Sequence, residues 1–208
     1  AAGLSKKGKK ILVIDLDPQG NATTGLGLSN IENSSDTIYG VLNGTKSINE
    51  VIKKTNFQNL DIVTSNVDLS GLEVETAGDS KRAFILKDQL MAYLNDSRDN
   101  YDYIFIDCPP SLSLLTVMAL VASFSLVVPL QTEFFALEGL SQLMKTIERI
   151  KVKLNPKLEI RGVLLTMFDK RNKLSTQVDT EAREFFKEKV YKTVIPRNVR
   201  LSEAPSHG

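Results

Sequence analysis

The chain has 208 residues, of which 42% are hydrophobic and 25% are charged. These proportions are typical of a globular protein that buries its core without disulfides or structural metals. The 26 lysines and arginines nearly balance the 25 acidic residues, so no global field commits the protein to nucleic acid or membranes.

Two rare residue types limit the chemistry that the chain can perform. Cys108 is the only cysteine and His207 the only histidine. An internal disulfide, a cluster held by several thiolates and a Ser-His-Asp triad in the body of the chain are therefore excluded. No stretch of about 18 uncharged apolar residues is present to span a bilayer. These features predict a soluble cytoplasmic protein that uses carboxylates, amides and a bound ion.

Short apolar runs alternate along the chain with longer segments of helical period. This order predicts an α/β fold with a doubly wound, mostly parallel sheet and helices on both faces, as in P-loop NTPases. No linker interrupts it, so we expect one domain over residues 1–208. The expected strands are 11–17, 60–65, 103–108, 126–131, 162–168 and 190–195, and the expected helices are 80–95, 136–155 and 174–190.

The helix at 136–155 repeats apolar residues three or four apart, which indicates a face turned toward the core. The helix at 174–190 has Ser175 or Thr176 as its expected N-cap.

The first strand delivers two acidic residues, Asp15 and Asp17, at its carboxyl end. Being two positions apart, they should point to the same side of an extended strand. Carboxylates this close repel one another unless a cation lies between them. The alternative interpretation is a solvated strand end followed by a Pro-Gly turn.

The strand at 103–108 ends in the same way, with Asp107 at its tip. An aspartate in this place holds the magnesium of a nucleotide in P-loop NTPases. It could equally cap the helix that follows. Two acidic strand ends in one open sheet favour a metal-phosphate site, because ligands bind at the carboxyl edge of such sheets.

Five blocks in chain order then resemble the ParA/Soj family of chromosome and plasmid partition ATPases. The blocks are DLDPQGNATTGLG, YDYIFIDCPPSLSLLTVMAL, LVVPLQTEFFALEGLSQL, GVLLTMFDKR and VYKTVIPRNVRLSEAPSHG. The resemblance implies ATP and Mg²⁺ as cofactors. It assigns Asp17 to the attacking water, Asp15 to support of the magnesium shell and Asp107 to the role of the Walker B aspartate.

The resemblance also implies a base-side pocket from Pro196, Arg197 and Asn198, with Met167 as a wall, although Met167 could be ordinary core. It assigns Arg171 and Arg200 to non-specific DNA backbone contacts. Solvated loop charges are the plainer interpretation of these arginines.

The family further implies an ATP-dependent homodimer, with Asn21 and Glu133 at its interface. It also implies a ParB-like centromere-binding partner that stimulates hydrolysis, and an association with the nucleoid.

The family's phosphate-binding loop, KGGxGKT, does not occur in the printed sequence. Its place would be upstream of Ala1, so we expect a fragment cut at both ends. The parent would be an ATPase, whereas these 208 residues would bind ATP poorly.

Three alternatives remain open from the sequence. A MinD-like ATPase would bind membranes through a basic amphipathic tail, which is not seen here. A nitrogenase-iron-protein-like reductase would need two cysteines per subunit. A degenerate, non-hydrolysing interaction protein would lack the loop altogether.

Overall fold

The computed structural model describes residues 1–28, 31, 33–96, 101–133, 136–198, 200 and 203, with only the backbone at 136 and 137. Contacts between Cα atoms divide the chain into two compact units. The first is built on Ala1–Ala122 and the second is Ser123–Ser202. The single domain expected from the sequence stays a prediction.

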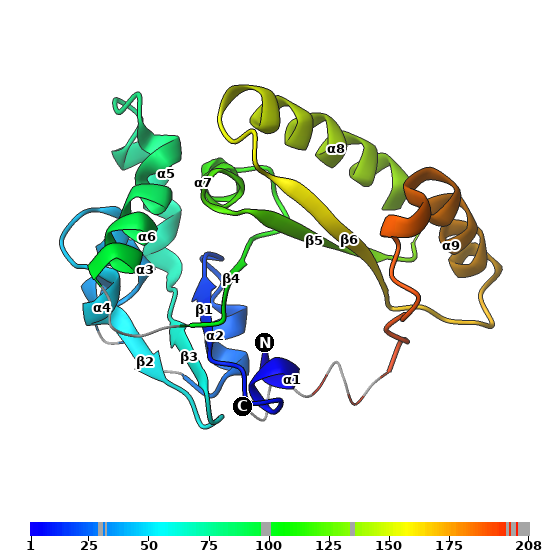
Figure 1. The fold of residues 1–208 in the computed structure, drawn as a ribbon, viewed down its shortest axis with the longest axis horizontal. Coiled ribbons are helices and arrows are strands. Elements are labelled where there is room, and N and C mark those ends of the chain that lie inside the picture. The colour runs from blue at the N-terminus through cyan, green and yellow to red at the C-terminus, as the bar shows by residue number, and fades with distance from the viewer. Residues whose placement is uncertain are drawn as a thin grey trace. The chain divides into compact units, whose positions relative to one another are not determined.

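The first unit contains a four-stranded sheet in the order β2-β3-β1-β4 (Figure 1). The central strand β1 runs parallel to both neighbours, and β2 pairs with β3 in the antiparallel sense. The second unit holds the parallel pair β5-β6. The strands are β1 Ile11–Asp15, β2 Ile52–Lys54, β3 Leu60–Val63, β4 Tyr103–Asp107, β5 Ser125–Gln131 and β6 Glu159–Thr166.

The helices alternate with these strands as the sequence predicts. They are α1 Ala2–Ser5, α2 Asn21–Gly25, α3 Ile38–Leu42, α4 Ile48–Val51, α5 Leu72–Glu75, α6 Ile85–Asp96, α7 Leu114–Ala122, α8 Ala136–Lys153 and α9 Lys173–Phe186. Short 3₁₀ turns are η1 Ser34–Asp36, η2 Val67–Gly71, η3 Arg82–Phe84 and η4 Lys187–Lys189.

Every residue of β1 is buried, because helices cover both faces of the first sheet. Leu12 and Ile14 face a core shared with α3, α4, α6 and α7. Ile11 and Val13 face the opposite side, where apolar residues of α1 and α2 pack. A continuously apolar strand is expected when both faces are covered. The predicted α/β class, with helices on both faces of a mostly parallel sheet, is confirmed.

Strand β4 forms one edge of this sheet, and its burial alternates. Ile104 and Ile106 pack against the core, while Tyr103 and Phe105 are 47% and 36% exposed and stack with their ring centroids 6.2 Å apart.

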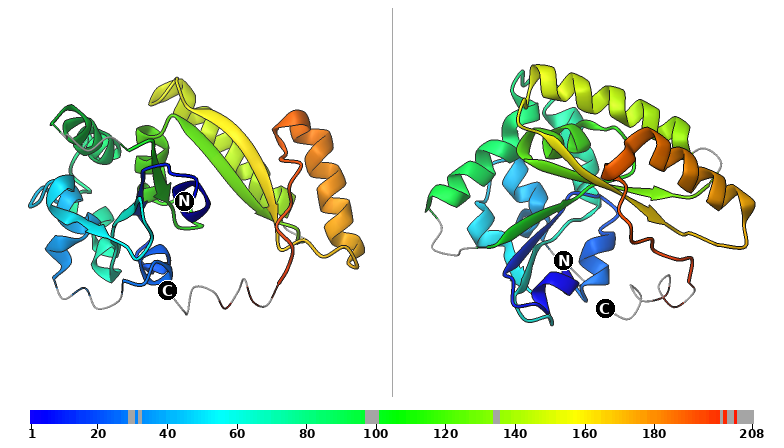
Figure 2. Two further views of the ribbon diagram at one scale, coloured as in Figure 1. Left: turned by 60° about the horizontal axis from the view of Figure 1, so that its bottom comes forward. Right: turned by 45° about the vertical axis from the view of Figure 1, so that its right-hand side comes forward.

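In the second unit, α8 and α9 pack on the β5-β6 pair around one core (Figure 2). The apolar stripe predicted for the long helix is confirmed at Leu140, Ile147 and Ile150, which are buried. Burial alternates along β5, as expected where one face is covered.

Two local predictions are wrong in this unit. Residues 190–195 form no strand; isolated bridges join Val190 to Val163 of β6 and Pro196 to Phe168, which lies two residues beyond the end of β6. The two bridges are five residues apart on one segment and six apart on the other, so the pairing changes register between them. The N-cap of α9 is Asn172, whose side chain accepts a hydrogen bond from the Leu174 N–H, rather than Ser175 or Thr176.

Within the described residues, none of the helices combines the length and the apolar character that crossing a membrane requires.

Candidate functional site

The carboxyl ends of β1 and β4 place two aspartates side by side. Asp15 and Asp107 are paired in the parallel register, each as the last residue of its strand. The pairing continues one step further, because the Leu16 N–H donates to the Asp107 carbonyl oxygen at 2.8 Å. The sheet thus brings together two of the three acidic residues identified in the sequence.

The Asp15 carboxylate is completely buried and fully engaged. Its Oδ2 accepts hydrogen bonds from the Thr23 backbone N–H at 2.8 Å and from the Thr23 hydroxyl at 2.7 Å. Its Oδ1 accepts from the Asp17 N–H at 3.1 Å. Asp15 therefore ties the end of β1 to the first turn of α2, whose free N–H groups need acceptors.

Thr23 is a site residue that the sequence analysis missed. Its hydroxyl oxygen also accepts a hydrogen bond at 3.0 Å from the Ser65 N–H, just after the end of β3. One buried hydroxyl thus joins the ends of two strands and a helix. The only sequence signal was a threonine in the DLDPQGNATTGLG block, where two adjacent threonines are indistinguishable without burial.

Asp17 lies outside the strand, because β1 ends at Asp15 and not at residue 17 as predicted. Asp17 begins a turn in which its Oδ1 accepts from the Gln19 N–H at 3.0 Å and its carbonyl from the Gly20 N–H at 2.9 Å. Gly20 has a φ of 63°, a left-handed conformation that glycine adopts without strain. Asn21 follows as the exposed first residue of α2.

The carboxylates shift one another's protonation. Burial raises the pKa of Asp15, although its hydrogen bonds with Thr23 and Asp17 reduce the effect. The pKa of Asp107 is also raised, by desolvation first and then by the charges of Asp15 and Asp17. Desolvation and the charges of Asp107 and Asp17 raise the pKa of the Cys108 thiol to about 12, so this thiol stays protonated at neutral pH.

These residues fit a magnesium ion only if further oxygen ligands come from a nucleotide. No described residue donates a hydrogen bond to the Asp107 carboxylate at the tip of β4. In the described parts of the chain, no three acidic, histidine or cysteine side chains are close enough to enclose a metal. Mg²⁺ is usually bound by one or two carboxylates together with substrate phosphates and water.

The second unit contains a cavity of about 630 Å³ at the end of β6. The turn leading into it begins at Met167, which has a left-handed φ of 53°. Its lining combines the predicted base-side residues with a predicted DNA-contact residue, whereas Met167 is not among the lining residues. The residues that line the cavity are Phe168, Asp169, Lys170, Arg171, Val194, Pro196, Arg197 and Asn198.

Backbone hydrogen bonds hold the two sides of this cavity together. The Phe168 N–H donates to the Ile195 carbonyl at 3.1 Å, and the Arg197 N–H donates to the Phe168 carbonyl at 3.0 Å. The cavity therefore has a fixed frame, with its charged side chains at the rim.

Arg171 is held by Asp169 through two parallel hydrogen bonds of 3.1 Å, from Nε to Oδ1 and from Nη2 to Oδ2. The guanidinium lowers the pKa of Asp169. Arg200 is exposed, and its backbone N–H donates to the Asn198 side chain at 2.9 Å. Glu133, predicted for the dimer interface, is exposed after the end of β5.

Comparisons with known proteins cover almost the whole chain. A protein-family model described as "AAA domain" matches residues 1–160. The chromosome partitioning protein ParA of Caulobacter vibrioides is 50% identical over 205 residues, which span 99% of this chain and 76% of that protein. The sporulation initiation inhibitor protein Soj of Bacillus subtilis is also 50% identical, over 100% of this chain and 80% of that protein.

Among solved structures, cobyrinic acid a,c-diamide synthase from Mycobacterium smegmatis, with a bound ATP analog and magnesium, superposes with a TM-score of 0.84. It is 33% identical, and the match covers 95% of this chain and 76% of that one. This likeness supports the α/β fold, whereas the extent and identity of the matches to ParA and Soj decide the family. The chain belongs to the ParA/Soj family of partition ATPases.

Proposed function

We propose that this protein is an ATP-driven switch for the partitioning of a chromosome or plasmid. It dimerises with ATP, binds DNA without sequence preference, and is reset by slow Mg²⁺-dependent hydrolysis. The observation that carries the proposal is the register of β1 and β4, which sets Asp15 beside Asp107 next to the turn that begins at Asp17.

Each carboxylate has a distinct task in this proposal. Bound Mg²⁺ neutralises charge on the nucleotide's phosphates. Asp107, whose carboxylate has no described hydrogen-bond donor, binds the ion directly or through water. Asp15 has both oxygens occupied, so it acts by fixing the strand end and the α2 turn. Asp17 orients the attacking water; a weak base suffices, because phosphoryl transfer depends mainly on positioning and charge neutralisation.

The phosphates of the nucleotide also need hydrogen-bond donors. The family's KGGxGKT loop offers backbone N–H groups, lysine and a hydroxyl for this purpose, and the printed chain contains no such string. We therefore assign to these 208 residues the metal, water-positioning, base-side and DNA contacts, and the phosphate contacts to that loop.

The cavity of the second unit provides the contacts to the base. Pro196, Arg197 and Asn198 line the base side, with Met167 in the adjoining turn. Arg171 and Arg200 contact DNA phosphates, and the affinity should fall steeply with salt. Asn21 and Glu133, both exposed, contribute to the dimer interface. The partner that resets the switch is a ParB-like centromere-binding protein, and the site of action is the nucleoid.

Two variants of the intact protein test the proposal. Asp17→Ala should abolish ATP turnover while ATP still supports dimerisation, because the water loses its positioning group. Arg171→Glu combined with Arg200→Glu should abolish ATP-dependent retention of random-sequence DNA while turnover without DNA is kept. ATP hydrolysis, size-exclusion chromatography and filter retention are the measurements.

Asp88→Ala is the matched control, since Asp88 is an exposed carboxylate on α6 away from the strand ends. Normal turnover in the Asp17 variant removes that residue from its role. An intact protein with no turnover at all favours the degenerate, non-hydrolysing alternative.

A further inference from the structure

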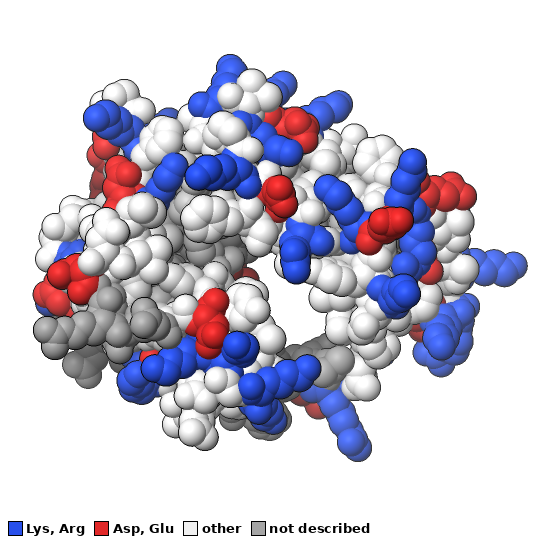
Figure 3. All heavy atoms as spheres, in the orientation of Figure 1, with Lys and Arg blue, Asp and Glu red and all other residues white. Residues whose placement is uncertain are grey.

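A second group of cations lies in the first unit, away from the three aspartates. Figure 3 shows basic side chains gathered over α1 and the β2-β3 hairpin, and in these segments all of them are lysines. We call the exposed lysines of this region the lysine patch. Its members are Lys6, Lys7, Lys9, Lys10 and Lys54.

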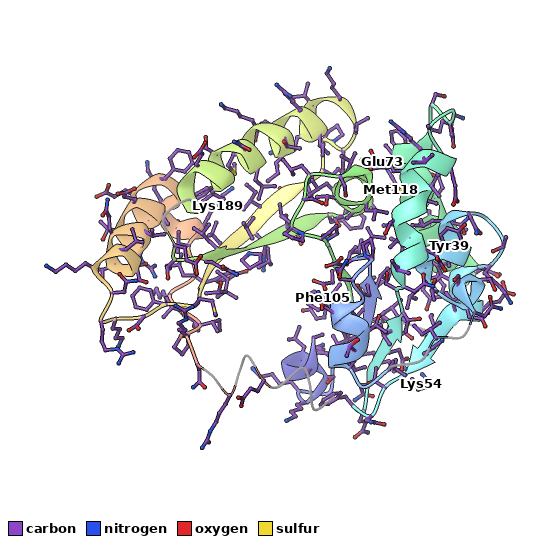
Figure 4. The ribbon with its side chains drawn as sticks, turned by 180° about the vertical axis from the view of Figure 1, so that it is seen from behind. Tyr39, Lys54, Glu73, Phe105, Met118 and Lys189 are labelled. Carbon is purple, nitrogen blue, oxygen red and sulfur yellow. The ribbon has the colours of Figure 1, made fainter. Side chains whose placement is uncertain are left out.

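The fold brings these residues together from two separate segments. Helix α1 ends in a tight turn, in which Gly8 has a φ of 79° and the Lys9 N–H donates to the Leu4 carbonyl at 3.2 Å. Lys10 then leads directly into β1. Lys54, the last residue of β2, reaches the same end of the sheet because it pairs with Asp61 near the start of β3 (Figure 4).

Only part of this positive charge is neutralised within the described structure. Lys9 Nζ forms an ion pair with Asp102 at 3.1 Å. Lys54 Nζ lies 2.7 Å from Asp61. The side chains of Lys6, Lys7 and Lys10 form no ion pair with any described residue.

A cavity of about 430 Å³ opens between Lys10 and Lys54. One lining residue, the nearly buried Asp61, also accepts a hydrogen bond from the Tyr101 hydroxyl at 2.7 Å. The remaining wall is the turn between β2 and β3, rich in side-chain amides that donate hydrogen bonds. Its lining residues are Lys10, Lys54, Thr55, Asn56, Phe57, Gln58, Asn59, Asp61 and Tyr101.

We propose that the lysine patch is a second surface for the phosphate backbone of nucleic acid, formed by the first unit in addition to Arg171 and Arg200 of the second. Several like charges spread over one edge fit a polymer of phosphates better than a single small anion. Ammonium and amide donors bind phosphate oxygens without reading sequence. This inference rests on the proposed function, because it deepens the DNA contact of the same switch.

Neutralising the three lysines without ion pairs tests the inference. The variant carries Lys6→Gln, Lys7→Gln and Lys10→Gln, and leaves both carboxylate pairs intact. Binding of a fluorescent random-sequence duplex to the intact protein is measured by anisotropy with ATP and Mg²⁺ over a salt series. The slope of log affinity against log salt should become less negative by up to about 2.7, and binding near 0.1 M salt should weaken by at least about tenfold.

A second triple variant controls for the change in net charge. It carries Lys145→Gln, Lys153→Gln and Lys157→Gln, which neutralise three exposed lysines of the second unit. This control should bind duplex within about twofold of the parent. Unchanged urea unfolding midpoints show that both variants are folded.

The outcomes separate the inference from the proposed function. The inference alone is overturned if the lysine variant binds duplex like the parent while the variant with Arg171→Glu and Arg200→Glu loses DNA binding. Equal weakening in the two triple variants also overturns it, since net charge then explains the loss. A parent that binds no duplex overturns the proposed DNA contact and this inference together. Loss of binding to anionic phosphatidylserine vesicles with unchanged duplex binding overturns the nucleic-acid assignment and indicates a membrane surface.

Discussion

The hydrogen bonds of Thr23 give a quantitative test of the site's internal support. Thr23→Val keeps the shape of the side chain but removes the hydroxyl that donates to Asp15 at 2.7 Å and accepts from the Ser65 N–H at 3.0 Å. A hydrogen bond to a charged group contributes about 1.5–3 kcal/mol, and a buried N–H left without an acceptor costs about 1–3 kcal/mol. Both effects come from one atom and do not simply add, so we expect the free energy of unfolding to fall by about 3 kcal/mol.

The measurement is the free energy of unfolding from urea denaturation of the intact protein at pH 7. Thr24→Val is the matched control, because Thr24 is the neighbouring residue of α2 and is exposed; it should change stability by less than about 0.5 kcal/mol. Thr23→Ser keeps the hydroxyl and should lose much less than Thr23→Val. If the valine variants at the two positions are equally stable, the hydroxyl does not hold a buried carboxylate and the reasoning is refuted.

Two further predictions concern other parts of the chain. Gly40→Ala should destabilise the protein by at least about 2 kcal/mol in the same urea assay, because the added Cβ would lie 2.0 Å from the Ser35 carbonyl oxygen. The control Gly139→Ala, with open space around the added Cβ, should be neutral or stabilising by up to about 1 kcal/mol. Equal effects of the two substitutions would contradict the close packing at Gly40. Asp169→Asn should tighten ATP-dependent duplex binding by roughly threefold in the anisotropy assay, because it frees the Arg171 guanidinium and removes a charge that repels phosphate. Weaker binding would mean that Asp169 instead orients Arg171 for the contact.

Local sequence was sufficient to predict the sheet's interior and the acidic residues at its edge. A run such as 11–15 is apolar at every position, which is typical of a strand covered on both faces, and β1 has that burial. Because parallel strands end at a common edge, Asp15 and Asp107 could be expected to lie together, and the register pairs them. The family followed from five blocks in order, and the relatives confirm it.

The sequence failed where a distant partner decides the local structure. Residues 190–195 have the composition of a strand, but their pairing with the neighbouring segment is limited to isolated bridges that differ in register by one residue. Strand β2 was not predicted, because it is a short edge strand that exists through its pairing with β3. The N-cap of α9 is Asn172 because the backbone turns there. Several nearby polar residues were equally plausible N-caps from the sequence alone.

The charges of the lysine patch are visible in the printed sequence, yet only the fold gives them a common surface. The lysines before β1 and the lysine at the end of β2 are far apart along the chain. Because β3 pairs with both β1 and β2, the fold brings these lysines to one end of the sheet. In the same way, Thr23 became a site residue only when burial distinguished it from Thr24. Composition and period determine which segments can form strands and helices, but register and burial are long-range properties, and they decide which side chains meet.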